Sequence, residues 1–322
     1  MYDRAISWPL AAALNRDSAP TLSFLNFIVF AAAAAPAGAP IVMDTPRSTA
    51  PATGTSHASP GSGAEASLVA LIRLGAAARR IVAFTGAGIS TESGIPDYRG
   101  PGGVWERQAP PTMGDFRENP ETRRDYWRWR REGYPALSAA EPNAGHIALA
   151  RLQQIGRVTT IITQNIDGLH QKAGADPDHV IELHGSAHRV RCLNCGTVYP
   201  APAIHQRLLD GEETPTCERC GGPLRAATVL FGEPLPPDAL QRATAAARDC
   251  DLMLVVGSSL IVNPAARLPA IAKQTGASLA IINQMPTPLD RLADVVVTAA
   301  AGSTLTTFTA AIGADVATVN SD

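Results

Sequence analysis

Residues 81–103 read I-V-A-F-T-G-A-G-I-S-T-E-S-G-I-P-D-Y-R-G-P-G-G, and the rest of the chain is best understood from this stretch. The apolar run at 81–84 has a β-branched start and predicts a buried strand. A glycine turn at 85–88 follows it, and residues 89–93 include serine and threonine that can cap a helix. A strand, a glycine turn and a helix N-terminus together form an anion site, because free backbone N–H groups and the positive helix end face a phosphate.

The glycine turn matches only part of the G-x-G-x-x-G fingerprint of dinucleotide-binding folds, since Thr91 stands where the third glycine belongs. Residues 96–103 are too rich in proline and glycine to continue as a helix and strand. They predict a long loop over whatever the glycine turn holds, and a plain dehydrogenase has no such loop. A dehydrogenase is also disfavoured because no acidic residue ends a second strand about 20 positions after the turn.

Four further motifs follow in the chain, and with them the sequence resembles the sirtuins, the NAD-dependent protein-lysine deacylases. They are Q-N-I-D at 164–167, L-H-G at 183–185, two C-x-x-C pairs at 192–195 and 217–220, and G-S-S at 257–259. The resemblance spans about residues 68–315. Each motif alone is weak evidence, but the ordered set is highly specific. G-I-P-D-Y-R and the run R-R-D-Y-W-R-W-R-R further resemble the subgroup that contains mitochondrial-type sirtuins with lipoamidase and weak deacetylase activity.

Composition indicates a globular protein with no strong charge bias. The 322 residues are 45% hydrophobic and carry 27 basic against 29 acidic side chains, so overall charge points to neither nucleic acid nor membrane as a partner. Four of the five cysteines fall in the C-x-x-C pairs, a spacing typical of zinc rather than disulfides. We therefore expect a reducing compartment and a cytoplasmic protein.

Residues 1–64 differ from the rest of the sequence. The apolar run at 22–35 is too short for an ordinary transmembrane helix and, with Arg4 and Arg16 before it, resembles a secretory signal. Residues 44–64 are rich in Ser, Thr, Pro, Gly and Ala, which predicts disorder. We expect a disordered or mis-started extension, with translation beginning at Met43, and keep a targeting segment as the alternative.

Strands alternate with helical stretches from residue 65 onward, which predicts an α/β fold. Short apolar strands are expected at 81–84, 158–163, 180–183, 252–256, 279–282 and 295–297, with helices at 67–79 and 142–152. This order favours a Rossmann-like, doubly wound parallel sheet. We expect a catalytic domain at 65–318, with a large lobe of 65–103, 149–186 and 227–318. The small lobe would combine a helical insertion at 104–148 with a zinc ribbon at 187–226.

The two C-x-x-C pairs predict a metal centre. Cys192, Cys195, Cys217 and Cys220 form two knuckles separated by 21 residues, and four thiolates at this spacing make a closed tetrahedral zinc site. Such a site has no position for water, so the zinc should be structural rather than catalytic. Cys250 precedes a buried strand and is expected to be a small core residue.

His184 is the candidate general base. It ends a predicted strand and precedes a glycine, and an imidazole that titrates near neutrality can accept a proton from a ribose hydroxyl. The resemblance also places the family's catalytic histidine here. By the same resemblance Asn165 and Asp167 line the nicotinamide pocket; from the pattern alone they are equally well turn formers at a strand end. His170 matches no catalytic position and is expected to be structural.

The remaining cofactor contacts are implied by the resemblance, through the glycine turn, the loop after it and the ends of four strands. They are Gly86, Ala87, Gly88, Ser90, Asp97, Tyr98, Arg99, Gln164, Ile166, Gly257, Ser258, Ser259, Asn283, Gln284, Met285 and Ala301. The expected cofactors are NAD and zinc.

Acylated-lysine proteins or peptides are the implied partners. The extended segment Val229, Leu230, Phe231 and Gly232 resembles the one on which sirtuins pair the substrate peptide. Backbone pairing reads a chain without demanding a sequence. Ala226 and Ala227 replace the commoner proline-containing spelling before it, so peptide preference stays open.

Two features of residues 119–134 allow alternatives. Five arginines lie within 123–131; a solvated helix face with acidic neighbours is favoured over a nucleic-acid patch. Aligned with the tyrosine and arginine that bind succinyl-lysine in a neighbouring sirtuin subgroup, Trp127 and Arg130 stand at the pair's positions. We expect them to line a pocket for acyl groups larger than acetyl; the alternative is that both lie outside the pocket.

The resemblance implies an NAD-dependent protein-lysine deacylase that releases nicotinamide, O-acyl-ADP-ribose and free lysine. In the family's mechanism the acyl oxygen attacks C1′ of the ribose, and the histidine then accepts a ribose hydroxyl proton so that the sugar attacks the resulting imidate. Protein mono-ADP-ribosylation and a non-catalytic NAD-sensing module are the alternatives.

Overall fold

The computed structural model describes residues 60–97 and 111–319. The apolar run at 22–35, most of the 1–64 extension, and Tyr98 and Arg99 lie outside the described residues.

A six-stranded parallel sheet forms the large lobe, as the apolar runs predict. Its strands are β1 (Ile81–Thr85), β2 (Val158–Thr163), β3 (Val180–Glu182), β7 (Leu252–Val256), β8 (Ser278–Ile282) and β9 (Val295–Val297). They lie in the order β3-β2-β1-β7-β8-β9. The chain therefore winds outward from β1 in one direction and from β7 in the other. All six carboxyl ends reach the same edge of the sheet, because every pairing is parallel.

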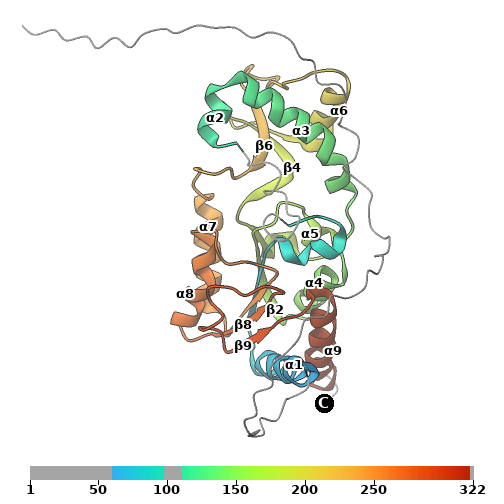
Figure 1. The fold of residues 1–322 in the computed structure, drawn as a ribbon, viewed down its shortest axis with the longest axis vertical. Coiled ribbons are helices and arrows are strands. Elements are labelled where there is room, and N and C mark those ends of the chain that lie inside the picture. The colour runs from blue at the N-terminus through green and yellow to red at the C-terminus, as the bar shows by residue number, and fades with distance from the viewer. Residues whose placement is uncertain (1–59, 98–110, 320–322) are drawn as a thin grey trace, which may run out of the picture. The chain divides into compact units, whose positions relative to one another are not determined.

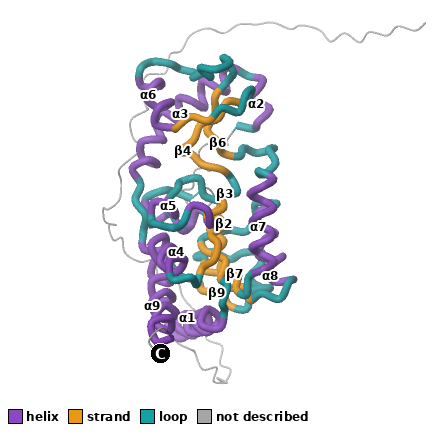
Figure 2. Tube along the Cα trace, turned by 180° about the vertical axis from the view of Figure 1, so that it is seen from behind, coloured by secondary structure: helices purple, strands orange, loops and turns teal. Residues whose placement is uncertain are grey.

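Helices cover both faces of this sheet, as Figures 1 and 2 show from opposite sides. On one face α1 (Pro60–Ala77), α4 (Ala144–Gln154) and α9 (Ala301–Val319) share an apolar core with the strands. On the other, α7 (Pro237–Asp249) and α8 (Leu268–Gln274) do the same. The strands β1 and β7 are buried along their whole length, which explains their unbroken apolar sequences.

A second, three-stranded antiparallel sheet forms the small lobe. It has the order β5-β4-β6, with β4 at Gly185–Cys192, β5 at Val198–Pro200 and β6 at Leu224–Thr228. The helix α6 (Ala201–Leu209) follows β5, and a short α5 (Leu169–Lys172) lies after β2. One face of the sheet, with α6 and the helix α3 (Pro120–Ala139), encloses a separate core of twelve buried residues that includes Cys192 and Cys217.

The helical insertion contributes α2 (Met113–Glu118) and α3 (Pro120–Ala139). Thr112 and Asp115 form a reciprocal capping box at the start of α2, and Asn119 caps α3 just before Pro120 at its first position. Buried Phe116, Trp127 and Tyr134 attach these helices to the small-lobe core. None of the described helices is long and apolar enough to span a lipid bilayer.

Candidate functional site

Two glycine turns pack against each other where the direction of winding reverses, between β1 and β7. Gly88 N–H donates to the carbonyl of Gly257 at 2.8 Å, and Gly86 N–H to that of Val256 at 3.0 Å. A Cβ on Gly86 would lie 2.7 Å from Gly257 O, and one on Gly88 2.8 Å from Gly257 Cα. Glycine is therefore required here for close backbone packing, at the edge where open α/β sheets bind their ligands.

The expected α-helix after the first glycine turn is absent from the described residues. Two 3₁₀ turns, Ala87–Ile89 and Thr91–Ser93, take its place, and neither has a side-chain N-cap. The Ser90 hydroxyl donates to Asp167 instead, and Gly94, with a φ of 80°, ends the second turn before Pro96. The expected helix N-terminus is therefore present only as a short 3₁₀ turn with Ser90 at its N-cap position, and the Ser90 side chain bonds Asp167 instead of capping the turn.

Backbone donors that could bind an anion lie in the two glycine turns rather than at a helix end. The N–H groups of Gly86, Gly88, Ile89 and Ser90 donate to protein carbonyls, so they are not free to meet a phosphate. Within the described chain, the N–H groups of Ala87, Ser258 and Ser259 have no protein acceptor. These three donors come from the two packed turns and are available to an anionic group such as a diphosphate.

Ser90 links the predicted pocket residues into one buried network. Its hydroxyl donates to Asp167 Oδ2 at 2.7 Å and accepts from Asn165 Nδ2 at 3.1 Å. His146 Nε2 lies 3.3 Å from the same hydroxyl, while its Nδ1 accepts the Asn143 N–H at 3.4 Å. Asn165 and Asp167 are each 6% exposed, so both side chains are held in fixed orientations. The directions of these bonds require a neutral His146 that donates from Nε2.

A second buried hydrogen-bonded group contains two threonine hydroxyls and His170. Thr85 Oγ1 donates to Thr163 Oγ1 at 2.9 Å and lies 2.9 Å from Nε2 of His170. His170 is 1% exposed, and its ring meets that of His146 edge-on at 5.0 Å. Burial lowers the pKa of His170 to about 3 and that of His146 to about 4. Both are neutral at pH 7, in agreement with the structural role expected for His170.

His184 lies at the end of β3, half-buried. Its Nδ1 lies 2.9 Å from the carbonyl oxygen of Gln164, which can only accept, so Nδ1 carries the proton and Nε2 is left as the basic nitrogen. Burial lowers the pKa of His184 below its usual value, although the Gln164 carbonyl partly opposes this. The imidazole is therefore neutral near pH 7 and able to accept a proton.

Gln164 joins this region to the second glycine turn, since its Nε2 donates to Ser258 Oγ at 2.7 Å. Further along the edge Asn283 follows β8 and donates to the carbonyl of Met285 at 2.7 Å. Gln284 and Met285 beside it are exposed, whereas Ala301 is buried in the core at the start of α9. Asp97 is half-buried just before the undescribed loop.

Residues 229–232 contact both the candidate base and the start of the helical insertion. Val229 N–H donates to the carbonyl of His184 at 2.9 Å, so this segment is tied directly to the candidate base. Phe231 is 43% exposed and bridges Thr112 in parallel, with its carbonyl accepting from Met113 N–H at 3.3 Å. Gly232 has a φ of 84° and turns the chain toward Glu233.

The four cysteines of the two C-x-x-C pairs converge, with all four sulfur atoms within 4.8 Å of one another. Cys192 Sγ lies 3.5 Å from Cys220 Sγ, and Cys195 Sγ 3.6 Å from Cys217 Sγ. Four sulfurs around one zinc at ~2.3 Å would stand ~3.8 Å apart, so the donor set and its spacing fit that metal. Cys250 stands apart from them in the large lobe, where it is 7% exposed and burial raises its pKa to about 11. Its expected place in the core is confirmed.

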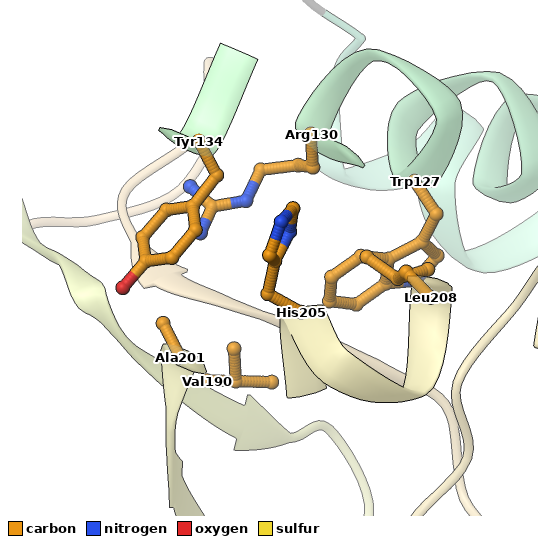
Figure 3. A pocket seen from close by; sticks show the side chains of 7 residues that line it. All are labelled: Trp127, Arg130, Tyr134, Val190, Ala201, His205 and Leu208. Atoms are coloured by element: carbon orange, nitrogen blue, oxygen red, sulfur yellow. The ribbon is translucent and has the colours of Figure 1, made fainter. Parts of the chain in front are cut away.

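Trp127 and Arg130 pack in the small lobe around a cavity of about 10 Å³, shown in Figure 3. Trp127 is 2% exposed, and Arg130 is 8% exposed and donates to the Ala187 carbonyl at 2.9 Å. The Arg130 guanidinium also lies over the Tyr134 ring, with Cζ 5.1 Å from its centroid. Such a cavity holds about one water molecule, and these core contacts favour the alternative that both residues lie outside an acyl pocket.

Three buried residues of the site were missed by sequence reasoning: His146, Thr85 and Thr163. His146 stands three residues after Asn143, where the two form a capping box at the start of α4. A histidine in that position is compatible with an ordinary cap. Only the approach of the β1 turn brings it to Ser90.

The whole arrangement matches known proteins. The model of the Sir2 family matches residues 86–264. The NAD-dependent protein deacetylase 1 of Bradyrhizobium diazoefficiens is 47% identical over 72% of this chain and 91% of its own. The NAD-dependent protein deacylase 2 of Pyrobaculum aerophilum is 45% identical over 71% of this chain and 90% of its own.

A solved complex of Sir2 with a p53 peptide and NAD⁺ superimposes with a TM-score of 0.68 at 37% identity, covering 76% of this chain and 98% of the Sir2 chain. The parallel sheet, the packed glycine turns, the Cys₄ cluster and the extent of these matches lead to one conclusion: the chain belongs to the Sir2 family.

Proposed function

We propose that this protein is an NAD-dependent protein-lysine deacylase that releases nicotinamide, O-acyl-ADP-ribose and free lysine. The observation that carries the proposal is the buried Ser90–Asn165–Asp167 network at the strand ends, with neutral His184 tied to the neighbouring Gln164 carbonyl at 2.9 Å. The deacetylase and deacylase names of relatives 47% and 45% identical to this chain support it.

NAD, when bound, supplies an electrophilic ribose carbon and a nicotinamide leaving group. The part of Asn165 and Asp167 is to hold the nicotinamide amide in a pocket where each is only 6% exposed. Ser90 fixes the Asp167 carboxylate by its 2.7 Å hydrogen bond and so keeps the pocket's shape before ligand arrives. The N–H groups of Ala87, Ser258 and Ser259 are the proposed diphosphate donors.

His184 acts as the general base in this proposal. Its Nδ1 proton is held by Gln164, which leaves the Nε2 lone pair available for a ribose hydroxyl proton. Because burial lowers its pKa, the base stays unprotonated below neutral pH as well. Activity should therefore fall only on the acid side of the usual histidine range.

We propose that residues 65–318 form the catalytic domain, and that zinc on the four cysteines holds the small lobe in register without touching substrate. Val229 to Gly232 are the proposed backbone contacts for the acylated peptide. Thiolates in a zinc site are stable in a reducing compartment, which supports a cytoplasmic location.

Acetyl is the acyl group that we propose as preferred. Trp127 and Arg130 make core contacts in the small lobe, so neither side chain is free to receive a long or acidic acyl tail. The kcat/KM values of acetyl-, octanoyl-, lipoyl-, succinyl- and glutaryl-lysine in one peptide test this. Acetyl should exceed each of the others by about tenfold, or ~1.4 kcal/mol of transition-state preference; a larger acyl group that matches it would contradict the assignment.

Mass spectrometry of the products with NAD tests the function itself. His184→Ala should lower deacylation by about 10²–10⁴-fold while zinc content and thermal stability stay unchanged. The exposed His179, which pairs with Asp176 at 2.9 Å, provides the matched control, and His179→Ala should retain full activity. Label from NAD attached to protein irrespective of acylation would indicate ADP-ribosyl transfer instead. Binding of NAD without turnover of any acyl peptide would indicate a sensing module.

A further inference from the structure

A groove of about 500 Å³ opens beside the open edge of β3, outside the strand-end site. Its lining comes from β3, β4, β6 and the start of α7. β3 is the last strand of the large sheet, so its outer edge pairs with no described strand. The volume falls within the ~300–1,000 Å³ typical of binding pockets.

The small-lobe sheet has two unlike faces, and the groove lies on the polar one. Along β4 and β6, Val190, Cys192, Leu224 and Ala226 face the buried core. The alternate positions Arg189, Arg191 and Arg225 line the groove. Since side chains alternate along a strand, these three arginines share one sheet face that no helix of the small-lobe core covers.

Arg225 is a buried cation with an unused donor. It is 6% exposed and forms a bidentate pair with Glu233, at 2.6 and 3.0 Å. Its Nε is also buried and has no hydrogen-bond partner among the described residues. A buried donor without an acceptor costs stability, but this atom is closed to solvent, so a ligand in the groove would meet the exposed Arg191 rather than the Arg225 Nε–H.

The other cations of the groove differ in how far they are neutralised. Arg189 pairs with Glu182 at 2.6 Å, and Arg242 donates to the Asp178 carbonyl at 2.6 Å and lies 4.0 Å from Asp238. Arg191 is exposed and has no acceptor in the part of the chain that the structure describes. Four arginines against two glutamates leave the groove cationic, with Arg191 as the available charge.

Part of the lining is apolar, and it includes part of the proposed peptide segment. Pro234, Leu235 and Pro237 line the groove, and so does Val229, the first residue of that segment. An open strand edge, apolar lining residues and an available arginine together suit an extended chain with alternating apolar and acidic side chains. A nucleic acid suits the groove less, because the open edge of β3 offers hydrogen bonds to a peptide backbone and the apolar lining offers contacts to peptide side chains.

We propose that this groove is a second docking site for the protein substrate, which binds an extended acidic segment lying outside the acylated lysine's own contacts. The segment adds to the edge of β3, and one of its carboxylates pairs with Arg191. The inference rests on the proposed deacylase function for the identity of the partner. The groove itself is independent of that function.

Binding is measured first, by fluorescence anisotropy of a short labelled peptide of alternating valine and glutamate that contains no acyl-lysine. Arg191→Glu should weaken its binding by about tenfold, through loss of one charge pair and gain of one repulsion. The same peptide with glutamine for glutamate should bind weakly to both proteins. Arg73→Glu, an exposed arginine on α1, is the matched control and should bind like the wild type. Equal binding by wild type and Arg191→Glu would overturn the proposal. So would a single-stranded oligonucleotide that binds more tightly than the acidic peptide in an Arg191-dependent way.

Turnover is measured next, on one acetyl-lysine peptide carrying either the acidic or the neutral extension. Wild type should show a lower KM for the acidic extension, and Arg191→Glu should abolish that difference without changing kcat on the neutral one. Failure to deacetylate either peptide would count against the proposed function, while the anisotropy result would still test the groove. Equal KM for the two extensions with wild type would overturn the docking site and leave the function standing.

Discussion

The strand-end site of the large lobe and the cysteine cluster of the small lobe are held in place by different forces. Asn165 and Asp167 are fixed by hydrogen bonds at the end of a sheet whose two faces are both covered by apolar cores. Cys192 and Cys217 belong instead to a single small core of twelve residues. From this comparison we expect the large lobe to fold on apolar burial alone and the small lobe, with its smaller core, to depend on zinc.

Removal of zinc should have the largest effect on stability and activity, and it should unfold the small lobe while the large lobe stays folded. Cys217→Ser should lose the metal, unfold the small lobe and abolish activity, since structural zinc sites have apparent binding free energies of about 10–16 kcal/mol. Zinc content, hydrogen exchange and activity are the measurements. Exchange should rise in β4, β5 and β6 while β1 and β7 stay protected.

Cys250 is the control for that experiment, because it is a cysteine of the large lobe. Cys250 is 7% exposed, and its thiol donates to the Ala247 carbonyl at 3.3 Å, far along the chain from both C-x-x-C pairs. Cys250→Ala should cost only about 1 kcal/mol and retain one zinc per chain. A metal-free Cys217→Ser protein that remains active would refute the dependence of the small lobe on zinc.

Within the large lobe, the packed glycine turns should be the most sensitive point. Gly257 has a φ of 61°, and a Cβ there would collide with the backbone of Gly88 and Ile89. Gly257→Ala should therefore cost about 2–5 kcal/mol, from left-handed strain and overpacking together, and should abolish NAD binding. Gly276 has a φ of 100° and open space where a methyl group would stand, so Gly276→Ala reports the strain alone.

Denaturant unfolding and NAD titration distinguish the two variants. Gly276→Ala should lose about 1–2 kcal/mol and bind NAD normally. Equal losses in the two variants would mean that the turns tolerate separation, and that their contact does not shape the site.

The large sheet could be predicted because the sequence of each strand alone, without knowledge of what packs against it, identifies a buried strand. The runs at 81–84 and 252–256 are apolar at every position, which only strands buried on both faces require. Their parallel order also followed from the alternation with helices. The 3₁₀ turns after β1 were not predictable, since local sequence favours capping by Ser90 and a residue 77 positions away decides otherwise.

In the small lobe, too, one feature could be predicted from the sequence and another could not. The cysteine spacing alone predicted a cluster that the structure brings within 4.8 Å. The orientation of α3 could not be predicted, because its arginines look alike in sequence. Arg128 pairs with Asp125 on the surface at 2.8 Å, while Arg130, two residues later, turns into the core. Which arginine points into the core depends on how α3 is rotated about its own axis relative to β4, and the sequence of α3 does not show this.

Acid should destabilise the large lobe more gradually than zinc removal destabilises the small one. Burial lowers the pKa of His146 to about 4 and that of His170 to about 3, from 6.5 in the unfolded chain. Between these values the unfolded state binds protons that the folded state cannot, so stability is fully present above about pH 6.5 and falls as the pH drops toward 4. Each histidine contributes a slope of up to about 1.4 kcal/mol per pH unit.

His170→Gln tests this assignment, because the amide can still donate to Thr85 Oγ1 but does not titrate. The variant's free energy of unfolding should depend less steeply on pH between 6 and 4, by about one proton, even if its stability at pH 7 is lower. His179→Gln, at an exposed position, should leave the slope unchanged. An unaltered slope in His170→Gln would mean that the acid sensitivity comes from His146 and the Ser90 network. In that case lowering the pH should disturb NAD binding before it unfolds the protein, because His146 contacts Ser90 directly at 3.3 Å.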